Sequence, residues 1–241
     1  MIKLEYKYLK EIINNSTLGS LLPVNFNPFK VCSFNCVFCS LGPTTKLSME
    51  RELFYPPEEI FSEIEDFIKN NGEPNYIWLT GDGEPALYLG FKNLASRIML
   101  EYPKIKIRAS SNGSLLHRED VRDEFLLCDL ITVNLNTLSP EECLRISRHH
   151  KDVKLDKVIQ GIKLLRQEFN GKFWIATVFV KGINDHKLNV QNLKSLLLEI
   201  NPDLYLVRGF SESKNNSLSE DFIKYVKEEF QDVNFQIEFS I

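Results

Sequence analysis

The sequence predicts one α/β domain over residues 1–241, built on a parallel sheet that closes only partly into a (β/α)6 barrel. Short apolar runs of strand length alternate with longer segments whose apolar residues recur at helical spacing, which is typical of parallel sheets. Six strand–helix units can be counted between residues 29 and 230, whereas a closed barrel of this kind has eight. The composition, with 43% hydrophobic and 26% charged residues, is ordinary for a globular domain.

The first half of the chain is expected to form strands and helices in strict alternation. The run at 76–80 is apolar and ends at a glycine, and the helix before it begins with two prolines and keeps its isoleucines and phenylalanines on one face. In chain order, we expect a strand at 29–31, a helix at 56–71, a strand at 76–80, a helix at 91–101, a strand at 105–110, a helix at 119–127 and a strand at 130–135.

The second half continues the alternation and ends in an edge strand. Ser139, Pro140 and Glu142 begin a helix, because a serine followed three residues later by a glutamate can cap the first helical turn. In chain order, we expect that helix from 139, a helix at 158–169, a strand at 173–180, a helix at 193–200, a strand at 204–207, a helix at 219–230 and a strand at 234–239.

Charge and cysteine usage exclude several classes of protein. The formal net charge of −4 and the isoelectric point near 5.7 offer no general attraction for nucleic acid or an anionic membrane. No apolar run reaches the length of a membrane span, and the start MIKLEYKYLK is too charged for a signal peptide. Five cysteines are an odd number, which disfavours a disulfide framework. We therefore expect a cytoplasmic protein that partners neither a membrane nor DNA.

Three of the five cysteines fall within VCSFNCVFCS, at Cys32, Cys36 and Cys39, in a loop expected over 30–42. A structural zinc site normally has four ligands in two separated pairs, and Cys128 and Cys143 lie far away in sequence, where they are expected to pack in the core. Three thiolates from one loop suit a four-iron cluster that leaves one iron open to a small molecule. Zinc, a disulfide and chance clustering are the alternatives.

Apolar residues surround these cysteines. Val31, Phe34, Val37 and Phe38 interleave with the three thiols, and shielding of this kind limits water access and tunes the potential of a cluster.

The cysteine spacing carries a family resemblance. C-x3-C-x2-C with an aromatic residue before the last cysteine resembles the signature of the radical S-adenosylmethionine (radical SAM) enzymes. The resemblance implies a partial barrel and a [4Fe–4S] cluster on Cys32, Cys36 and Cys39, with the amino and carboxylate groups of S-adenosylmethionine on the open iron. It further implies reductive cleavage of the sulfonium to methionine and a 5′-deoxyadenosyl radical, which abstracts hydrogen from a substrate. An electron donor of the flavodoxin or ferredoxin type is implied as a partner.

A second motif follows the strand at 76–80. Gly81, Asp82, Gly83, Glu84 and Pro85 stand at the carboxyl end of that strand, where active sites of βα barrels lie, and glycine allows close approach of a ligand to the backbone. GDGEP resembles the glycine-rich element with which the family contacts the amino group of S-adenosylmethionine. The alternative is a plain turn, since Gly-Asp-Gly is favourable turn chemistry.

Polar residues follow three further strands. Ser111 and Asn112 come after the third strand, Asn134 and Asn136 end the fourth, and Asn184 follows the fifth in VKGIND. In the family, the third position offers contacts to the ribose and the carboxylate, and the fifth lies near the adenine. A hydrophobic strand that ends in asparagines is unusual if it merely packs, so we expect all of these residues to bind the cofactor. Each of them alone could instead be an ordinary polar loop residue.

Within the superfamily, NFNPFKVCSFNCVFCSLGPTT, SNGSLL, SRHH and VKGIND resemble a branch related to the wyosine-type tRNA-modifying synthases. Those synthases carry a second iron–sulfur cluster on cysteines near the amino terminus. This chain has no cysteine before Cys32, so that second cluster is not expected here.

The most basic stretch follows the fourth strand. Arg145, Arg148, His149 and Lys151 belong to LRISRHHKDVKLDK and are the candidates to meet a phosphate-bearing substrate, although such a run is often a solvated helix face. The first hypothesis for function is therefore an enzyme that modifies a nucleoside in RNA, through tRNA modification. The second is an enzyme that modifies a protein or peptide, such as a glycyl-radical activating enzyme. The third is a non-catalytic iron–sulfur scaffold.

Overall fold

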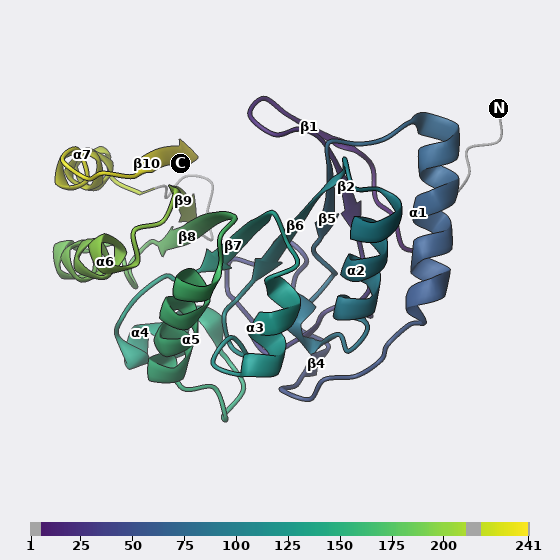
Figure 1. Ribbon diagram of the computed structural model, residues 1–241. Coiled ribbons are helices and arrows are strands. Elements are labelled where there is room, and N and C mark those ends of the chain that lie inside the picture. The colour runs from purple at the N-terminus through teal and green to yellow at the C-terminus, as the bar shows by residue number, and fades with distance from the viewer. Residues whose placement is uncertain (1–5, 211–217, 241) are drawn as a thin grey trace.

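A curved, mostly parallel sheet dominates the computed structural model, which describes residues 6–210 and 218–240. In the described residues the strands of this sheet follow the order β1-β2-β5-β6-β7-β8-β9-β10, and only β1 runs antiparallel to its neighbour. Figure 1 shows the sheet as a half-barrel with helices around its outside. The expected partial α/β barrel is therefore confirmed.

The elements have the following bounds. The strands of the large sheet are β1 (Ile13–Asn15), β2 (Gly19–Val24), β5 (Tyr76–Leu79), β6 (Lys106–Ser111), β7 (Leu130–Asn134), β8 (Lys172–Val180), β9 (Leu204–Phe210) and β10 (Gln236–Ser240). A separate pair is formed by β3 (Val31–Cys32) and β4 (Lys46–Leu47). The helices are α1 (Pro57–Asn71), the short 3-10 helix η1 (Pro85–Leu87), α2 (Phe91–Glu101), α3 (Glu119–Phe125), α4 (Pro140–Ser147), α5 (Leu155–Glu168), α6 (Lys187–Ile200) and α7 (Glu220–Glu229).

The helices begin where their sequences supply caps. The side chain of Ser139 accepts a hydrogen bond from the backbone N–H of Glu142 at the start of α4, as expected from the sequence. Ser219 caps α7 in the same way, through the backbone N–H of Phe222. Helix α6 begins at Lys187, six residues before the predicted start at 193, because the His186 side chain caps its first turn.

The first strand is where the sequence prediction is wrong. Of residues 29–31 only Val31 lies in a strand, and that strand, β3, pairs with β4 outside the large sheet. Its place beside β5 is taken by β2, whose Pro23 argues against a central strand because proline has no N–H to donate. The Pro23 carbonyl accepts from the N–H of Lys10, so the strand keeps a partner on that side. Counted from β2, six strand–helix units remain.

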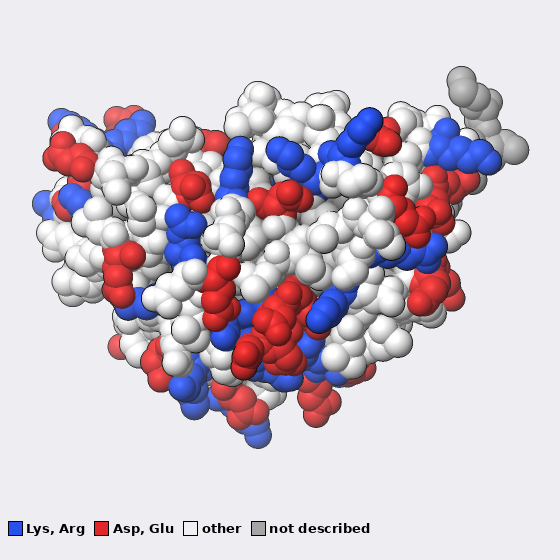
Figure 2. Space-filling model, in the orientation of Figure 1, with Lys and Arg blue, Asp and Glu red and all other residues white. Residues whose placement is uncertain are grey.

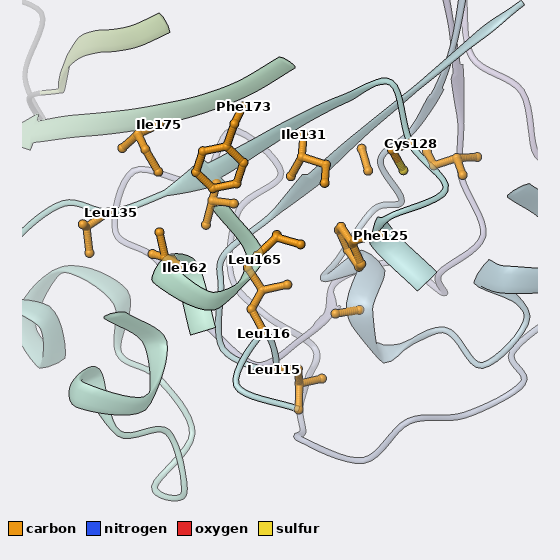
Figure 3. Close-up of a cluster of buried hydrophobic side chains, with 14 of the residues drawn as sticks. Leu115, Leu116, Phe125, Cys128, Ile131, Leu135, Ile162, Leu165, Phe173 and Ile175 are labelled. Carbon is orange, nitrogen blue, oxygen red and sulfur yellow. The ribbon is translucent and has the colours of Figure 1, made fainter. Parts of the chain in front are cut away.

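The hydrophobic core divides between the two faces of the sheet. On the convex face, Ile131 and Phe173 pack against helical residues such as Ile162 and Leu165, and Figure 3 shows this cluster beside α5. Residues of the opposite parity point to the concave face, as the alternation along a strand requires. A smaller buried cluster lies there, formed by Leu18, Leu21, Tyr76, Leu130, Trp174, Ala176, Leu204 and Leu206.

The surface has mixed charge. Figure 2 shows lysines and arginines interspersed with carboxylates over one face, without a broad field of a single sign. Within the part of the chain that the structure describes, no helix combines the length and the apolar character needed to cross a bilayer.

Candidate active site

The three clustered cysteines lie between β3 and β4. Cys32 ends β3, and a turn in which the N–H of Cys39 donates to the Cys36 carbonyl at 3.2 Å brings the other two together. All three thiols are partly exposed, whereas Cys128 and Cys143 are buried in the main core. The sequence prediction separates these two groups in the same way.

Two of the clustered thiols, Cys32 and Cys36, have raised pKa values. Burial raises the pKa of Cys32 to about 11, and the charges of Glu84 and Cys39 act in the same direction. Burial also raises the pKa of Cys36, with Cys32 and Cys39 as the next contributors. Three thiols in one electrostatic environment are a soft donor set, and an iron cluster would have to hold them deprotonated.

A single metal ion and an iron cluster make different demands on the three cysteines. In residues 6–210 and 218–240, no three His, Cys, Asp or Glu side chains converge where one metal ion could sit. A four-iron cluster makes no such demand, because each thiolate binds a different iron. The Nζ of buried Lys30 lies 3.0 Å from the Cys39 sulfur, and the Asn112 Nδ2 lies 3.7 Å from the Cys32 sulfur. These donors stabilise negative charge on the two sulfurs.

Backbone hydrogen bonds hold the cysteine loop against the end of α4. The N–H of Asn35 donates to the Ser147 carbonyl at 2.7 Å, and the N–H of Val37 donates to the Ile146 carbonyl at 2.9 Å. Val37 and Phe38 also pack against the cluster of Ile146, Val178 and Val180, at the end of β8. The expected apolar surround of the cysteines is thus present.

The GDGEP turn lies directly against the backbone that leads into Cys32. The N–H of Lys30 donates to the Asp82 carbonyl at 2.8 Å, and the N–H of Glu84 donates to the Val31 carbonyl at 3.2 Å. A Cβ added at Gly83 would lie 1.8 Å from the Val31 carbonyl oxygen. Glycine is therefore required there for the approach of the cysteine strand, a reason that the sequence does not reveal.

The acidic side chains of the turn are engaged by protein groups. Asp82 accepts a hydrogen bond from the Asn25 side chain at 2.8 Å and pairs with Lys10. Glu84 is 2% exposed, caps η1 through the N–H of Ala86 and accepts from the Ser111 hydroxyl at 2.7 Å. A ligand at this turn would meet its backbone rather than the two carboxylates.

Glu84 should make the stability of the fold depend on pH. Burial raises its pKa from 4.5 to about 7, although hydrogen bonds from Asn112, Ser111 and Ala86 oppose the shift. Between these values the folded chain holds a proton that the unfolded chain has lost, so stability falls as pH rises through this window, by roughly 3 kcal/mol in all.

Glu84→Gln should flatten that dependence, because glutamine does not titrate. The measurement is the free energy of unfolding in urea for both proteins at about pH 5 and about pH 8. Equal slopes against pH for the two proteins would contradict the assignment.

Asn112 and Asn134 border a small cavity beside the cysteine loop. Asn112 donates to the Ser33 hydroxyl at 2.8 Å, and its backbone N–H donates to the Glu84 carboxylate at 2.8 Å. The cavity measures about 20 Å³ and is lined by Phe34, Asn112, Asn134, Leu135, Asn136, Thr137, Cys143, Ile146, Ser147, Leu155 and Val158. Asn112 after β6 and Asn134 at the end of β7 thus line the same cavity as Phe34 of the cysteine loop.

Comparison with known proteins identifies the chain. The sequence model of the Radical SAM superfamily matches residues 26–190, a stretch that includes the three cysteines and the GDGEP turn. The chain belongs to the radical SAM superfamily. Its cofactors are therefore those of the superfamily, a [4Fe–4S] cluster and S-adenosylmethionine, and the enzymes of this superfamily need a reductant and a substrate.

Two curated relatives illustrate the similarity of this radical SAM enzyme to longer proteins. A protein named GTPase Obg of Brachyspira hyodysenteriae is 28% identical over an alignment of 243 residues. The alignment covers 99% of this chain and 35% of that protein. A UPF0026 protein of Methanocaldococcus jannaschii is 34% identical over 189 residues, or 77% of this chain and 58% of that protein. The chain thus spans between a third and three fifths of the length of these two relatives.

Solved structures share the fold. SuiB of Streptococcus suis superimposes with a TM-score of 0.66 at 20% identity, over 92% of this chain and 49% of that one. An archaeal TYW1 gives a TM-score of 0.56 at 14% identity, over 86% of this chain and 70% of that one. Identities this low establish the partial barrel and nothing about the substrate.

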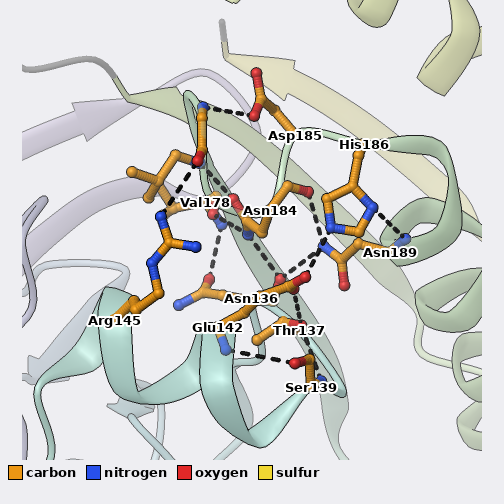
Figure 4. Close-up of polar contacts among 12 residues, drawn as sticks. Asn136, Thr137, Ser139, Glu142, Arg145, Val178, Asn184, Asp185, His186 and Asn189 are labelled. Carbon is orange, nitrogen blue, oxygen red and sulfur yellow. Dashed lines mark hydrogen bonds and ion pairs between the residues drawn. The ribbon is translucent and has the colours of Figure 1, made fainter.

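Asn136 and Asn184 form a brace between loops in this radical SAM enzyme. Asn184 is fully buried; its Oδ1 accepts from the N–H of Val180 at 2.6 Å, and its Nδ2 donates to the carbonyls of Asn136 and Val178. The Asn136 Oδ1 accepts from the N–H of Val178 at 2.8 Å. Figure 4 shows these bonds converging between β8 and the start of α6. The Asn184 side chain is committed to protein groups through both of its polar atoms, whereas the Asn136 side chain is held at its Oδ1 and also lines the cavity.

The basic segment, residues 144–157, lies against the cysteine loop. The backbone N–H of His150 donates to the Ser33 carbonyl at 2.9 Å, and the ring of half-buried His149 lies 6.0 Å from that of Phe34. Arg148 ends α4 in the left-handed conformation with φ of 42°. Arg145, Arg148 and Lys151 are exposed, and a long contact of 3.4 Å joins the Arg145 guanidinium to the Gly182 carbonyl.

Sequence reasoning missed a group on the concave face. Arg108 of β6 is 8% exposed and lies between the rings of Trp78 and Trp174. In IKIRAS, Arg108 shares its face of the strand with Lys106 and Ser110, a pattern that indicates a polar face, so the sequence gives no sign that this arginine is buried.

Proposed function

We propose that this enzyme cleaves S-adenosylmethionine reductively and abstracts hydrogen from a nucleoside of RNA, as a step of tRNA modification. The observation that carries the proposal is the attachment of the basic segment to the cysteine loop, through the hydrogen bond from His150 to Ser33. Exposed cations therefore stand next to the residues that would hold the cluster. The electron donor in this proposal is a flavodoxin or a ferredoxin, and the compartment is the cytoplasm.

Cys32, Cys36 and Cys39 would hold the cluster in this proposal. When bound, the cluster supplies an electron that breaks the sulfonium of S-adenosylmethionine. Lys30 and Asn112 donate toward two of the ligand sulfurs, which favours the more negative, reduced state.

The residues around the GDGEP turn would border S-adenosylmethionine. The backbone of Gly81–Pro85 is hydrogen-bonded to the strand that leads into Cys32. Asn112 and Asn134 line the cavity beside the cysteine loop. Ser111 acts indirectly, since its hydroxyl holds Glu84, and Asn136 and Asn184 act by bracing the neighbouring loop.

The substrate assignment rests on charge. Arg148 and Lys151 are exposed and form no ion pair within the described residues, so they are available to neutralise phosphates. A protein or peptide substrate is the second candidate, which the formal net charge of −4 favours.

Removing two cations from the basic segment should weaken the salt dependence of tRNA binding. Each cation that contacts a phosphate releases about one counterion, so Arg148→Ala with Lys151→Ala should flatten the slope of log affinity against log salt by about two units. The measurement is a titration of tRNA at several salt concentrations.

A matched double variant controls for net charge. Lys69→Ala with Lys92→Ala removes two exposed cations from α1 and α2, and should leave the slope as in the wild type. Absorbance of the cluster and uncoupled cleavage of S-adenosylmethionine should be unchanged in both. An unchanged slope in the first variant, or no tRNA binding by the wild type, would transfer the proposal to a protein or peptide substrate.

A further inference from the structure

Arg108 lies on the concave face of the sheet, between two tryptophans. Its register partner on β5 is Trp78, so both side chains point to the same face, and the guanidinium carbon lies 4.5 Å from the Trp78 ring centroid. Trp174 of β8 approaches from the other side at 5.4 Å. Cation–π attraction to the two rings holds the guanidinium in place. The side chain is thus fixed before any ligand arrives.

The charge of Arg108 has no protein counter-ion among residues 6–210 and 218–240. Its Nε is buried without a hydrogen-bond partner, and so is the hydroxyl of Thr132 on the next strand. The Thr132 register partner is Trp174, which places this hydroxyl on the same face. Stacking satisfies the faces of a guanidinium but not its N–H groups, which lie in its plane.

A second cation faces the same concavity. Arg208 of β9 is paired in register with Val178, on the face that carries Trp174, and it is exposed. Burial lowers the pKa of Arg108 to about 10, and the like charge of Arg208 contributes. Arg108 therefore stays protonated at neutral pH, with a neighbour that repels it.

A buried charge with no partner is costly, and an arginine so placed gains most from a ligand that brings the opposite charge. The fork of N–H groups on a guanidinium matches two oxygens of a carboxylate or a phosphate. Thr132 can donate a further hydrogen bond to such a group. The Arg108 Nε–H and the Thr132 hydroxyl are therefore the unpaired groups that an oxyanion could satisfy.

We propose that Arg108, held between Trp78 and Trp174, binds an oxyanion of the substrate, either a phosphate or a carboxylate. This inference rests on the proposed function in one respect, namely that substrate enters the concave side of the sheet. It adds an anchor at a distance from the cysteine loop, which fixes the position of the substrate relative to the radical chemistry.

The tryptophans themselves supply the measurement. The whole chain contains two tryptophans, Trp78 and Trp174, and both contact Arg108. Their fluorescence therefore reports on this site alone. We would titrate the cluster-loaded protein, without oxygen, with inorganic phosphate, a nucleoside 5′-monophosphate and acetate, against potassium chloride at equal ionic strength. A saturable change in fluorescence with at least one oxyanion, absent with chloride, is expected.

Variants separate binding from a general salt effect. Arg108→Met should weaken the oxyanion response about tenfold or more, since a hydrogen bond to a charged group is lost. Arg118→Met removes an exposed arginine that pairs with Asp120 on the outside of the molecule, and should titrate like the wild type. Without ligand, Arg108→Met should also melt at an equal or higher temperature, by up to about 4 °C, because an unpaired buried charge is gone.

The arms of the titration identify the source of the oxyanion. A response to phosphate and the nucleotide but not to acetate assigns a phosphate, and the reverse assigns a carboxylate. No saturable response to any of them, or the same response in Arg108→Met, overturns the proposal. The experiment uses neither tRNA nor cleavage of S-adenosylmethionine, so its failure is distinguishable from failure of the proposed function.

Discussion

Replacing Cys32, Cys36 or Cys39 singly with alanine should abolish the iron–sulfur cluster. The three thiols share one loop and one environment, and a cluster with three protein ligands has no substitute for any of them. After reconstitution without oxygen, the wild type should bind about four irons and four sulfides, and each variant should lose the visible absorption. Iron and sulfide analysis with absorbance spectra is the measurement.

Cys128→Ala and Cys143→Ala are the matched controls. Both thiols are buried in the core, and that of Cys143 lies 3.6 Å from the Ser147 hydroxyl. Each variant should keep the full iron content and lose only some stability. Loss of iron in either control would contradict the ligand assignment, as would a wild type that binds zinc and shows no visible absorption.

Gly83→Val should impair cluster assembly and S-adenosylmethionine binding together. Any Cβ at this position would lie 1.8 Å from the Val31 carbonyl oxygen, so the backbone one residue before Cys32 has to move. Displacement of the first ligand costs the cluster, and without the cluster the cofactor has no iron to bind. Iron content and equilibrium binding of S-adenosylmethionine, measured on the same preparation, test both effects.

Gly182→Ala separates this collision from ordinary backbone strain. Gly182 has a φ of +76° and nothing within 4 Å of an added Cβ, so alanine there meets strain but no neighbour. We expect a modest loss of stability, of about 1 kcal/mol, with normal iron content. If Gly83→Val also assembled a full cluster and lost only affinity for S-adenosylmethionine, the turn would contact the cofactor rather than the cysteine strand.

The parts of the fold and site that could be predicted from sequence are those set by local pattern. Helical and strand periodicity gives the order of the elements from 56 onward, and the spacing of Cys32, Cys36 and Cys39 identifies the chemistry of the loop. The strand β2 could not be predicted, because Pro23 is unfavourable in a paired strand and the partners of β2 on both sides become known only from the fold.

The roles of individual polar residues could not be predicted, because they depend on what lies across the fold. A polar side chain at the end of a strand can face a ligand or satisfy a backbone group, and sequence does not distinguish these cases. Asn184 satisfies backbone groups of β8 and its neighbouring loop, whereas Asn112 lies beside a cysteine sulfur. Arg108 is the opposite case, since its unpaired state becomes visible only when both tryptophans are in place.

The attachment of the cysteine loop to α4 bears on how the enzyme survives damage by oxygen. Its hydrogen bonds run from the N–H groups of Asn35 and Val37 to carbonyls of α4, and none of them involves a thiol. A protein that has lost its cluster is therefore expected to retain the conformation of the cysteine loop. Refilling then requires little further ordering of the chain, since most of the entropy of arranging the ligands has already been lost in folding. Recovery after oxidative stress would be limited by the delivery of iron and sulfide, not by refolding.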